Sequence, residues 1–252
     1  GGGPGGGATS RNPRGRGRKD AGPVEFKIPH AAGGMDGGVD VKFAIAMGKL
    51  GGLAVLNLEG VQTRYKNPRE VLQKIIEADK AEITALLQKI YQEPVQEDLI
   101  RARVKEMKDA GIRVAVSSIP QRAESFGAIA QEAGADIFVV QSTVSTARHI
   151  SSEYQSLDLR KFCGEMKIPV IVGNTVGFDA TLEIMECGPA AVLIGVGPVA
   201  ACTSRGVLCL GVPQVPAPVA FDAAADAYFN QTDRYHPLLQ RCTLMNMDAA
   251  RT

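Results

Sequence analysis

Three stretches of the chain share one pattern: DAGIRVAV (109–116), EAGADIFVV (132–140) and ECGPAAVLI (186–194). Each begins like the end of a helix, continues with a glycine, and ends in a short apolar run. Glycine suits the left-handed conformation that often follows a helix C-terminus. Apolar runs without alternation are typical of strands that are buried on both faces. The three copies therefore predict repeated helix–strand units and a parallel sheet.

Two architectures fit this pattern, an open doubly wound sheet and a (β/α)8 TIM barrel. No G-x-G-x-x-G follows a strand, which counts against a dinucleotide-binding doubly wound sheet. We therefore predict the α/β class and an incomplete (β/α)8 barrel with about six to seven strands. Strands are expected at 27–32 (weak), 53–56, 112–116, 137–140, 169–172, 191–194 and 235–239, with helices over 121–133, 179–187 and 220–229.

Composition is that of an ordinary globular chain. The 252 residues include 28 basic and 27 acidic side chains, so the net charge of +1 gives no reason to expect a polyanion partner. Hydrophobic residues make up 45% and charged residues 22%, which excludes a wholly disordered chain. No apolar run approaches the roughly 20 residues of a membrane span, so no membrane partner is expected.

The N-terminal 22 residues differ from the rest. Nine are glycine, and five basic residues against one acid give this stretch a charge of +4. We expect a disordered Gly/Arg-rich tail at 1–22, a partial-barrel catalytic domain at 23–239 and an irregular tail at 240–252. An RNA-binding arm or a targeting remnant is the alternative for 1–22. The absence of interleaved aromatics argues against nucleic acid, and the scarcity of serine favours a cytoplasmic location.

The cysteines predict reduced thiols and no metal site. There are five, none in a C-x-x-C pair, and the three histidines stand apart. An odd count without a secretory segment is typical of an intracellular protein. Cys163, Cys187 and Cys209 are expected to be structural.

The loop AVLIGVGPVAACTSR (191–205) carries the strongest chemical signal. In parallel α/β folds, the loops after strand C-termini hold the active site. Backbone N–H groups and a nearby arginine can lower the pKa of the Cys202 thiol, and Ser204 offers a hydroxyl for proton transfer. Gly195 and Gly197 allow the backbone to approach a phosphate or an ion. The alternative is a buried cysteine in a tight turn.

The same loop resembles a known family. GVGPVAACTSRGVLCLGVPQ (195–214) is similar to the catalytic loop of the IMP dehydrogenase/GMP reductase family, G-x-G-P-G-x-x-C-T-[ST]-R followed by G-V-P-Q. The segments 35–57 and 169–176 resemble the family's first βαβ segment and its fifth strand. The likeness covers about residues 28–239 and is greatest to the IMP dehydrogenase-related subgroup, which lacks CBS domains. Residues 58–111 leave no room for those domains, which favours the reductase or this subgroup.

The resemblance implies an NAD(P)-dependent oxidoreductase that forms tetramers. A cysteine thiolate would attack C2 of a purine nucleotide (IMP, GMP or XMP), with NAD or NADP exchanging hydride and a monovalent cation at the cysteine loop. One alternative is a non-catalytic, truncated homologue that associates with an intact relative. Another is an unrelated barrel enzyme that acts on a phosphorylated metabolite.

The resemblance assigns roles position by position. Cys202 would be the nucleophile and Ser204 the proton-handling hydroxyl; the substrate-binding residues would be Met35, Asn174, Gly195 and Gly197. Asn174 could equally be a turn residue and Met35 a core residue, and Asp36 and Asn57 could each cap a helix. No cofactor-binding residue is assigned, because Gln141-Ser142-Thr143 replaces the Asp-Ser-Ser of the dehydrogenases.

Several positions depart from the family pattern. Val199, Gly33 and Gly177 replace a glycine, a serine and a threonine, and no Asp-Gly-Gly follows the segment Tyr235–Gln240. In the family that aspartate holds the ribose hydroxyls. We therefore expect the 252-residue chain to be a poor enzyme by itself.

This expectation is tested by incubating the purified chain with GMP and NADPH, and separately with IMP and NAD. Cofactor absorbance should change little above the rate without nucleotide. Robust turnover of either nucleotide would overturn the expectation.

Overall fold

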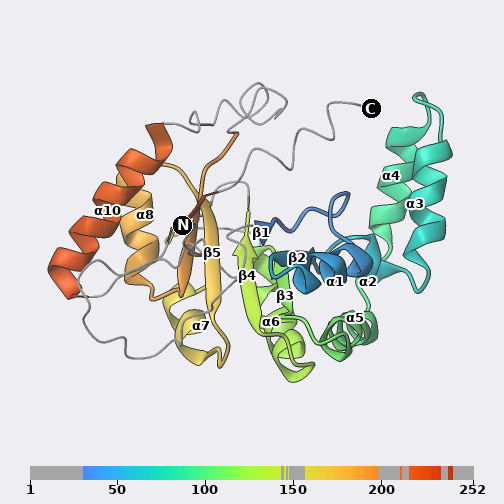
Figure 1. Cartoon of the computed structure of the whole chain (residues 1–252). Coiled ribbons are helices and arrows are strands. Elements are labelled where there is room, and N and C mark those ends of the chain that lie inside the picture. Colours follow the sequence, from blue (N-terminus) through green and yellow to red (C-terminus); the bar gives the residue numbers. More distant parts are fainter. Residues whose placement is uncertain are drawn as a thin grey trace, which may run out of the picture.

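The computed structural model describes residues 31–142, 145, 147, 157–197, 211, 216–233 and 238–240. Seven strands form one sheet in the order β1-β2-β3-β4-β5-β6-β7, and each neighbouring pair is parallel. The sheet is curved, and the helices lie around its outside (Figure 1). The predicted α/β class and partial barrel are thereby confirmed. The strands are β1 (Ala31–Ala32), β2 (Leu53–Asn57), β3 (Ala115–Ser118), β4 (Ile137–Gln141), β5 (Val170–Thr175), β6 (Ala191–Ile194) and β7 (Leu238–Gln240).

Helices separate most of the strands. The first two strands are joined by α1 (Val41–Lys49), and later crossovers contain α6 (Ala123–Glu132), α7 (Leu159–Glu165), α8 (Phe178–Glu186) and α10 (Pro216–Thr232). A short 3-10 turn, η1 (Pro120–Arg122), precedes α6. Between β2 and β3 the chain forms α2 (Val61–Arg64), α3 (Pro68–Glu77), α4 (Ile83–Gln92) and α5 (Glu97–Asp109). No described helix is long and apolar enough to cross a membrane.

The three repeated glycines have the expected conformation. Gly111, Gly134 and Gly188 have φ values of 75°, 99° and 81°, each directly after the residue that ends a helix. This conformation strains residues with a side chain, so glycine there ends the helix at little cost. The helix–glycine–strand pattern therefore describes the backbone that the chain adopts.

Strand boundaries differ from those predicted mainly at the C-terminal ends. The expected strand 112–116 begins at Ala115 and continues to Ser118, while β2, β4 and β5 each extend into polar residues. The prediction followed apolar runs, which mark the buried part of a strand. The strand itself ends where its backbone pairing ends, which here is one to three residues later. The polar residues that continue the strands are those expected to face a ligand at the mouth of a barrel.

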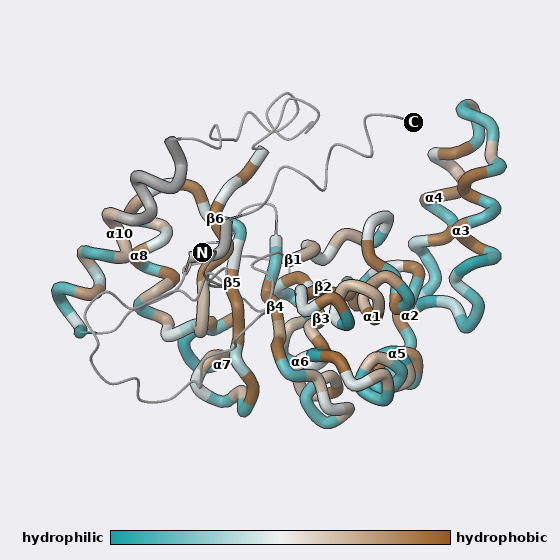
Figure 2. The backbone as a smooth tube through the Cα atoms, viewed as in Figure 1, coloured by the Kyte–Doolittle hydropathy of each residue, from teal (hydrophilic) through white to brown (hydrophobic). Residues whose placement is uncertain are grey.

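Apolar side chains form two main layers. The larger layer lies between the outer face of the sheet and the helices, and includes Leu56, Val116, Phe138 and Met107. Figure 2 shows the corresponding hydrophobic strands at the centre and hydrophilic stretches on the surrounding helices. The smaller layer lies on the inner face of the sheet and consists of Leu53, Val55, Ala115, Ile137, Val139, Ile171 and Ala191.

The helices α3 and α4 form a hairpin that stands away from the sheet (Figure 1). Val61, Val71 and Ile90 form a small apolar cluster that joins this hairpin to α2. Three hydrogen bonds add to the connection: Tyr65 Oη donates to Ile90 O at 3.1 Å, Arg64 donates to Glu93 O, and Gln96 Nε2 donates to Arg64 O at 2.7 Å. The hairpin is thus held firmly against α2.

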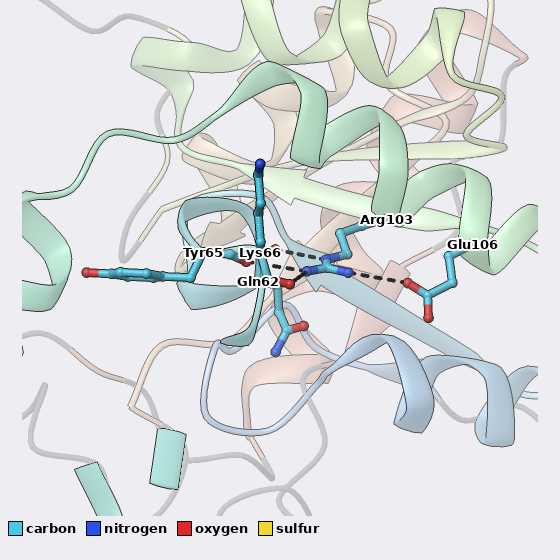
Figure 3. Close-up of polar contacts among 5 residues, drawn as sticks. All are labelled: Gln62, Tyr65, Lys66, Arg103 and Glu106. Atoms are coloured by element: carbon cyan, nitrogen blue, oxygen red, sulfur yellow. Dashed lines mark hydrogen bonds and ion pairs between the residues drawn. The ribbon is translucent and has the colours of Figure 1, made fainter. Parts of the chain in front are cut away.

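Arg103 of α5 binds the C-terminal end of α2, which the hairpin also contacts. Its Nε donates to Gln62 O at 3.0 Å, and its Nη2 donates to Tyr65 O at 3.3 Å and to Lys66 O at 2.9 Å (Figure 3). These carbonyls lie at and beyond the end of α2, where helical partners are lacking. The additional contact with the carboxylate of Glu106, at 3.5 Å, is a surface ion pair that contributes little.

Two glycines provide a test of this packing. A Cβ on Gly173 would lie 2.5 Å from the backbone oxygen of Leu193, whereas a Cβ on Gly164 in α7 would meet nothing within 4 Å. Gly173→Ala should lower the free energy of unfolding by about 1–3 kcal/mol, because the β5–β6 pair must separate. Gly164→Ala should raise it by about 0.5–1 kcal/mol, since alanine is the better helix former.

Urea unfolding followed by circular dichroism measures both values. Equal stability of the two variants would contradict the close approach of β5 and β6.

Candidate functional site

Polar side chains gather at the C-terminal ends of adjacent strands. Alternate residues of a strand share one face, so Asn57, Ser117 and Gln141 continue the inner face that Val55, Ala115 and Val139 begin. Asn57 and Ser117 are also register partners. The inner face of the curved sheet therefore changes from apolar to polar toward the edge where parallel α/β proteins bind their ligands.

Asn174 lies deepest among the predicted site residues. It is 2% exposed, on β5, and its peptide bond with Gly173 is cis. Its backbone is paired on both sides: Asn174 N donates to Ser142 O at 3.3 Å, and Ser145 N donates to Asn174 O at 2.6 Å. Its side-chain amide makes no hydrogen bond with the residues that the structure describes. Within the described residues this leaves a buried amide without a hydrogen bond, an arrangement that costs about 1–3 kcal/mol.

Ser142 and Ser145 hold the loop after β4 against β5. Ser145 Oγ donates to Gly173 O at 2.6 Å, and Ser142 N donates to the same oxygen at 3.0 Å. The two hydroxyl oxygens are 3.0 Å apart. These contacts fix the backbone on either side of Asn174 and do not involve its side-chain amide.

Met35 lies in the loop after β1 and is half-buried, outside the apolar clusters of the described chain. A tight turn defines its backbone: Met35 N donates to Gly33 O at 2.7 Å, and Gly38 N and Val39 N both donate to Met35 O at 3.0 Å. The loop also lies directly over Ser117, because a Cβ on Gly34 would collide with the Ser117 hydroxyl. Met35 is therefore a loop residue at the strand ends, and a barrel-core position does not describe it.

The sequence allowed Asp36 and Asn57 each to cap a helix; Asp36 does so at the start of α2, 25 positions along the chain, whereas Asn57 pairs with a turn amide outside any helix. Both carboxylate oxygens of Asp36 accept from Val61 N, the first residue of α2, at 3.0 Å. Asn57 Oδ1 accepts from Glu59 N at 2.9 Å. Each side chain pairs a backbone donor just beyond a strand end.

Gly195 and Gly197 follow β6 and begin the cysteine loop. Their φ values are 107° and 56°, and Gly195 N donates to Thr175 O at 3.0 Å. Gly195 is thereby held beside Thr175, the residue that follows Asn174 and ends β5. Cys202 and Ser204, like Val199, lie outside the described residues, so their predicted roles stay predictions.

Cys163 and Cys187 belong to the helical layer, as expected for structural thiols. Cys163 lies in α7 and Cys187 directly follows α8; both are free and half-buried. Burial raises the pKa of the Cys163 thiol to about 12, with a smaller contribution from Cys187. Burial also raises the pKa of the Cys187 thiol, although Arg160 opposes this. Both thiols are protonated at neutral pH and hence poor nucleophiles.

Ser117 and Glu59 are candidates that the sequence did not single out. Ser117 is 2% exposed, and its hydroxyl has no hydrogen bond within the described chain. Glu59 Oε1 accepts from Ile119 N at 2.9 Å, and burial raises the pKa of the Glu59 carboxyl, while the Ile119 hydrogen bond and two arginines lower it. For Ser117 the available signal was its place two positions after Ala115, the last inward apolar residue of β3; Glu59 had no such signal.

A metal site is not formed by the described residues: no group of three His, Cys, Asp or Glu side chains is close enough to hold an ion. What the strand ends do offer is a set of neutral hydrogen-bonding groups, namely the amides of Asn57, Gln141 and Asn174 and the hydroxyl of Ser117. Such groups suit a polar organic ligand with several donors and acceptors.

Comparison with known proteins agrees with this description. The sequence profile described as the IMP dehydrogenase / GMP reductase domain matches residues 17–231. An uncharacterised oxidoreductase of Mycolicibacterium smegmatis is 35% identical over 213 residues, which are 82% of this chain and 57% of the relative. An inosine-5′-monophosphate dehydrogenase of Cryptosporidium parvum is 29% identical over 207 residues, covering 77% of this chain and 49% of that protein.

A solved structure has the same arrangement of strands and helices. The IMP dehydrogenase/GMP reductase-like protein from Corynebacterium glutamicum superposes with a TM-score of 0.79 at 30% identity, over 86% of this chain and 58% of that one. The chain thus spans somewhat more than half the length of these bacterial relatives. Because the family profile covers most of the sequence, the chain belongs to the IMP dehydrogenase / GMP reductase family.

Proposed function

We propose that this chain is an NAD(P)-dependent purine nucleotide oxidoreductase of the IMP dehydrogenase or GMP reductase type. The observation that carries the proposal is Asn174, a buried amide without a hydrogen-bond partner in the described chain, beside the glycine that opens the cysteine loop. Its donor and acceptor suit the polar edge of a purine or a ribose hydroxyl. Membership of a family that binds purine nucleotides supports the same ligand class.

Catalysis would proceed through a covalent bond between Cys202 and C2 of the purine. In the oxidising direction, the thiolate adds to C2, C2 loses a hydride, and water then displaces sulfur to give XMP from IMP. In the reducing direction, the thiolate adds to C2 of GMP, ammonia leaves, and a hydride delivered to C2 releases the thiol and IMP. Ser204 would transfer the proton of the water or of the leaving group.

NAD or NADP, when bound, supplies or accepts the hydride. The end of β4 fits the sugar of such a cofactor, because Gln141 is half-buried there and offers both a donor and an acceptor. Gln141 lacks the negative charge of the aspartate found at this position in the dehydrogenases. Gly195 and Gly197 would shape the nucleotide loop and a monovalent cation site, and the complete enzyme would be a homotetramer with residues 23–239 in its catalytic domain.

Thiol reactivity tests the proposed nucleophile. At pH 7.5, iodoacetamide should modify Cys202 faster than Cys163 and Cys187. The raised pKa values of the Cys163 and Cys187 thiols leave almost no thiolate at these two positions. IMP or GMP at saturating concentration should slow the modification of Cys202 alone. Peptide mass spectrometry measures each rate, and a Cys202 that reacts no faster than Cys163 would remove the mechanism.

Nucleotide binding tests Asn174. Asn174→Ala should weaken the binding of IMP or GMP about tenfold or more, measured by isothermal titration calorimetry, because two ligand hydrogen bonds are lost. Its unfolding free energy should not fall by more than about 1 kcal/mol, because the substitution breaks no hydrogen bond within the described fold and removes an unpaired buried polar group. Asn67→Ala is the matched control: Asn67 precedes α3, and its Nδ2 bonds the exposed Glu70 at 2.6 Å.

If Asn174→Ala binds the nucleotide as tightly as the parent chain, Asn174 has no part in substrate binding. If both variants lose affinity equally, the effect is one of folding and not of a contact.

A further inference from the structure

We propose that Tyr91 of the α3–α4 hairpin is a positioning residue that holds the Met35 loop in its binding conformation. The hairpin belongs to the connection between β2 and β3, and no step of the proposed reaction uses it. The inference rests on the proposed function only where it concerns the nucleotide; the contact between hairpin and loop is a feature of the fold.

The first step is the contact itself. The Tyr91 hydroxyl donates to Asp36 Oδ2, and this bond joins residues that are 55 positions apart. Asp36 is the neighbour of Met35, so a constraint on the Asp36 side chain restricts the backbone of the loop. A hydrogen bond to an ionised carboxylate is among the stronger kinds in proteins.

The second step is the site that receives Asp36. Both carboxylate oxygens accept from Val61 N at 3.0 Å, and a Cβ on Gly60 would collide with Asp36 Oδ1. Gly60 therefore leaves the space in which the carboxylate lies, and the start of α2 supplies a donor. Tyr91 adds a second donor from the hairpin, so the carboxylate is held by two separate elements.

The third step is the rigidity of Tyr91. The Arg64 guanidinium lies over its ring, 5.6 Å from the ring centre, and Arg64 Nε donates to Glu59 O at 2.9 Å. Arg64 also donates to Glu93 O, two residues after Tyr91. The ring is 41% exposed, so Arg64 and Asp36 fix an aromatic side chain that solvent would otherwise leave mobile.

The Tyr91 phenol keeps its proton in the folded chain, as a hydrogen-bond donor to Asp36 must. Burial, the hydrogen bond to Asp36 and the negative charge of Asp36 raise the pKa of the Tyr91 phenol well above its ordinary value of 10.0, while Arg64 lowers it. The protonated form is thus favoured in the folded chain. The stability that the phenol proton contributes does not fall until the pH passes about 10, the ordinary pKa of tyrosine, and is lost as the pH rises through the higher pKa of the folded chain.

The test compares two tyrosines that differ in one respect. Tyr91→Phe removes the bond to Asp36 and keeps the ring over Arg64. Tyr65→Phe is the matched control, because its hydroxyl joins α2 to Ile90 O of the same α4 at 3.1 Å without touching Asp36. A general loosening of the hairpin would affect both variants alike.

Two measurements are made on each variant of the 252-residue chain. Hydrogen exchange of the Gly38 and Val39 amides, which donate to Met35 O, reports on the loop without any ligand. Calorimetric titration with IMP and with GMP reports on binding. Tyr91→Phe should accelerate the exchange of both amides about tenfold and weaken nucleotide binding about three- to tenfold, whereas Tyr65→Phe should change neither.

Each outcome decides the proposal. Unchanged exchange in Tyr91→Phe overturns the contact with the loop, and equal effects in both variants overturn its specificity. Faster exchange with unchanged nucleotide affinity overturns the positioning role. If the unsubstituted chain binds neither nucleotide, the proposed function falls, and the contact between hairpin and loop is judged on exchange alone.

Discussion

Backbone hydrogen bonding between parallel strands determines where the chemistry of this chain can lie. The ladder from β1 to β7 carries every strand end to the same edge, and its register brings Asn57 beside Ser117. Apolar side chains fill the inner face below that edge, so the polar groups above them are held on a rigid base. Positions that are far apart in sequence become one surface because their backbones are paired.

Between β5 and β6, backbone pairing leaves very little space for side chains. A register shift at Gly173 and Thr175 moves the pairing, and the backbones come so close that Gly173 has no room for a side chain. Ser142 and Ser145 then satisfy the displaced backbone groups around Asn174. Gly173 O and both backbone groups of Asn174 are paired, whereas the Asn174 side-chain amide has no hydrogen bond among the described residues. A buried polar group without a partner is rare in folded proteins and needs an explanation.

The α3–α4 hairpin gives the same edge a second support. It is joined to α2 by an apolar cluster and hydrogen bonds, and it contacts the loop after β1 through Tyr91. The loop of Met35 is consequently braced from outside the barrel as well as from β3 below. Support of this kind, by residues that do not touch the ligand, sets how well a binding group is pre-organised.

Local sequence determined the helix–glycine–strand repeats, the fold class and the family, because each depends on residues close together in the chain. It also predicted that Cys163 and Cys187 belong to helical segments, where the structure places them, whereas Cys209 lies outside the described residues. Only the tertiary structure decided that the strands continue into Ser117, Gln141 and Asn174. It also decided that Asp36 binds α2 across 25 positions and accepts a hydrogen bond from Tyr91. Apolar patterning reports burial, whereas these features depend on backbone pairing and on contacts between distant segments, and no local pattern encodes them.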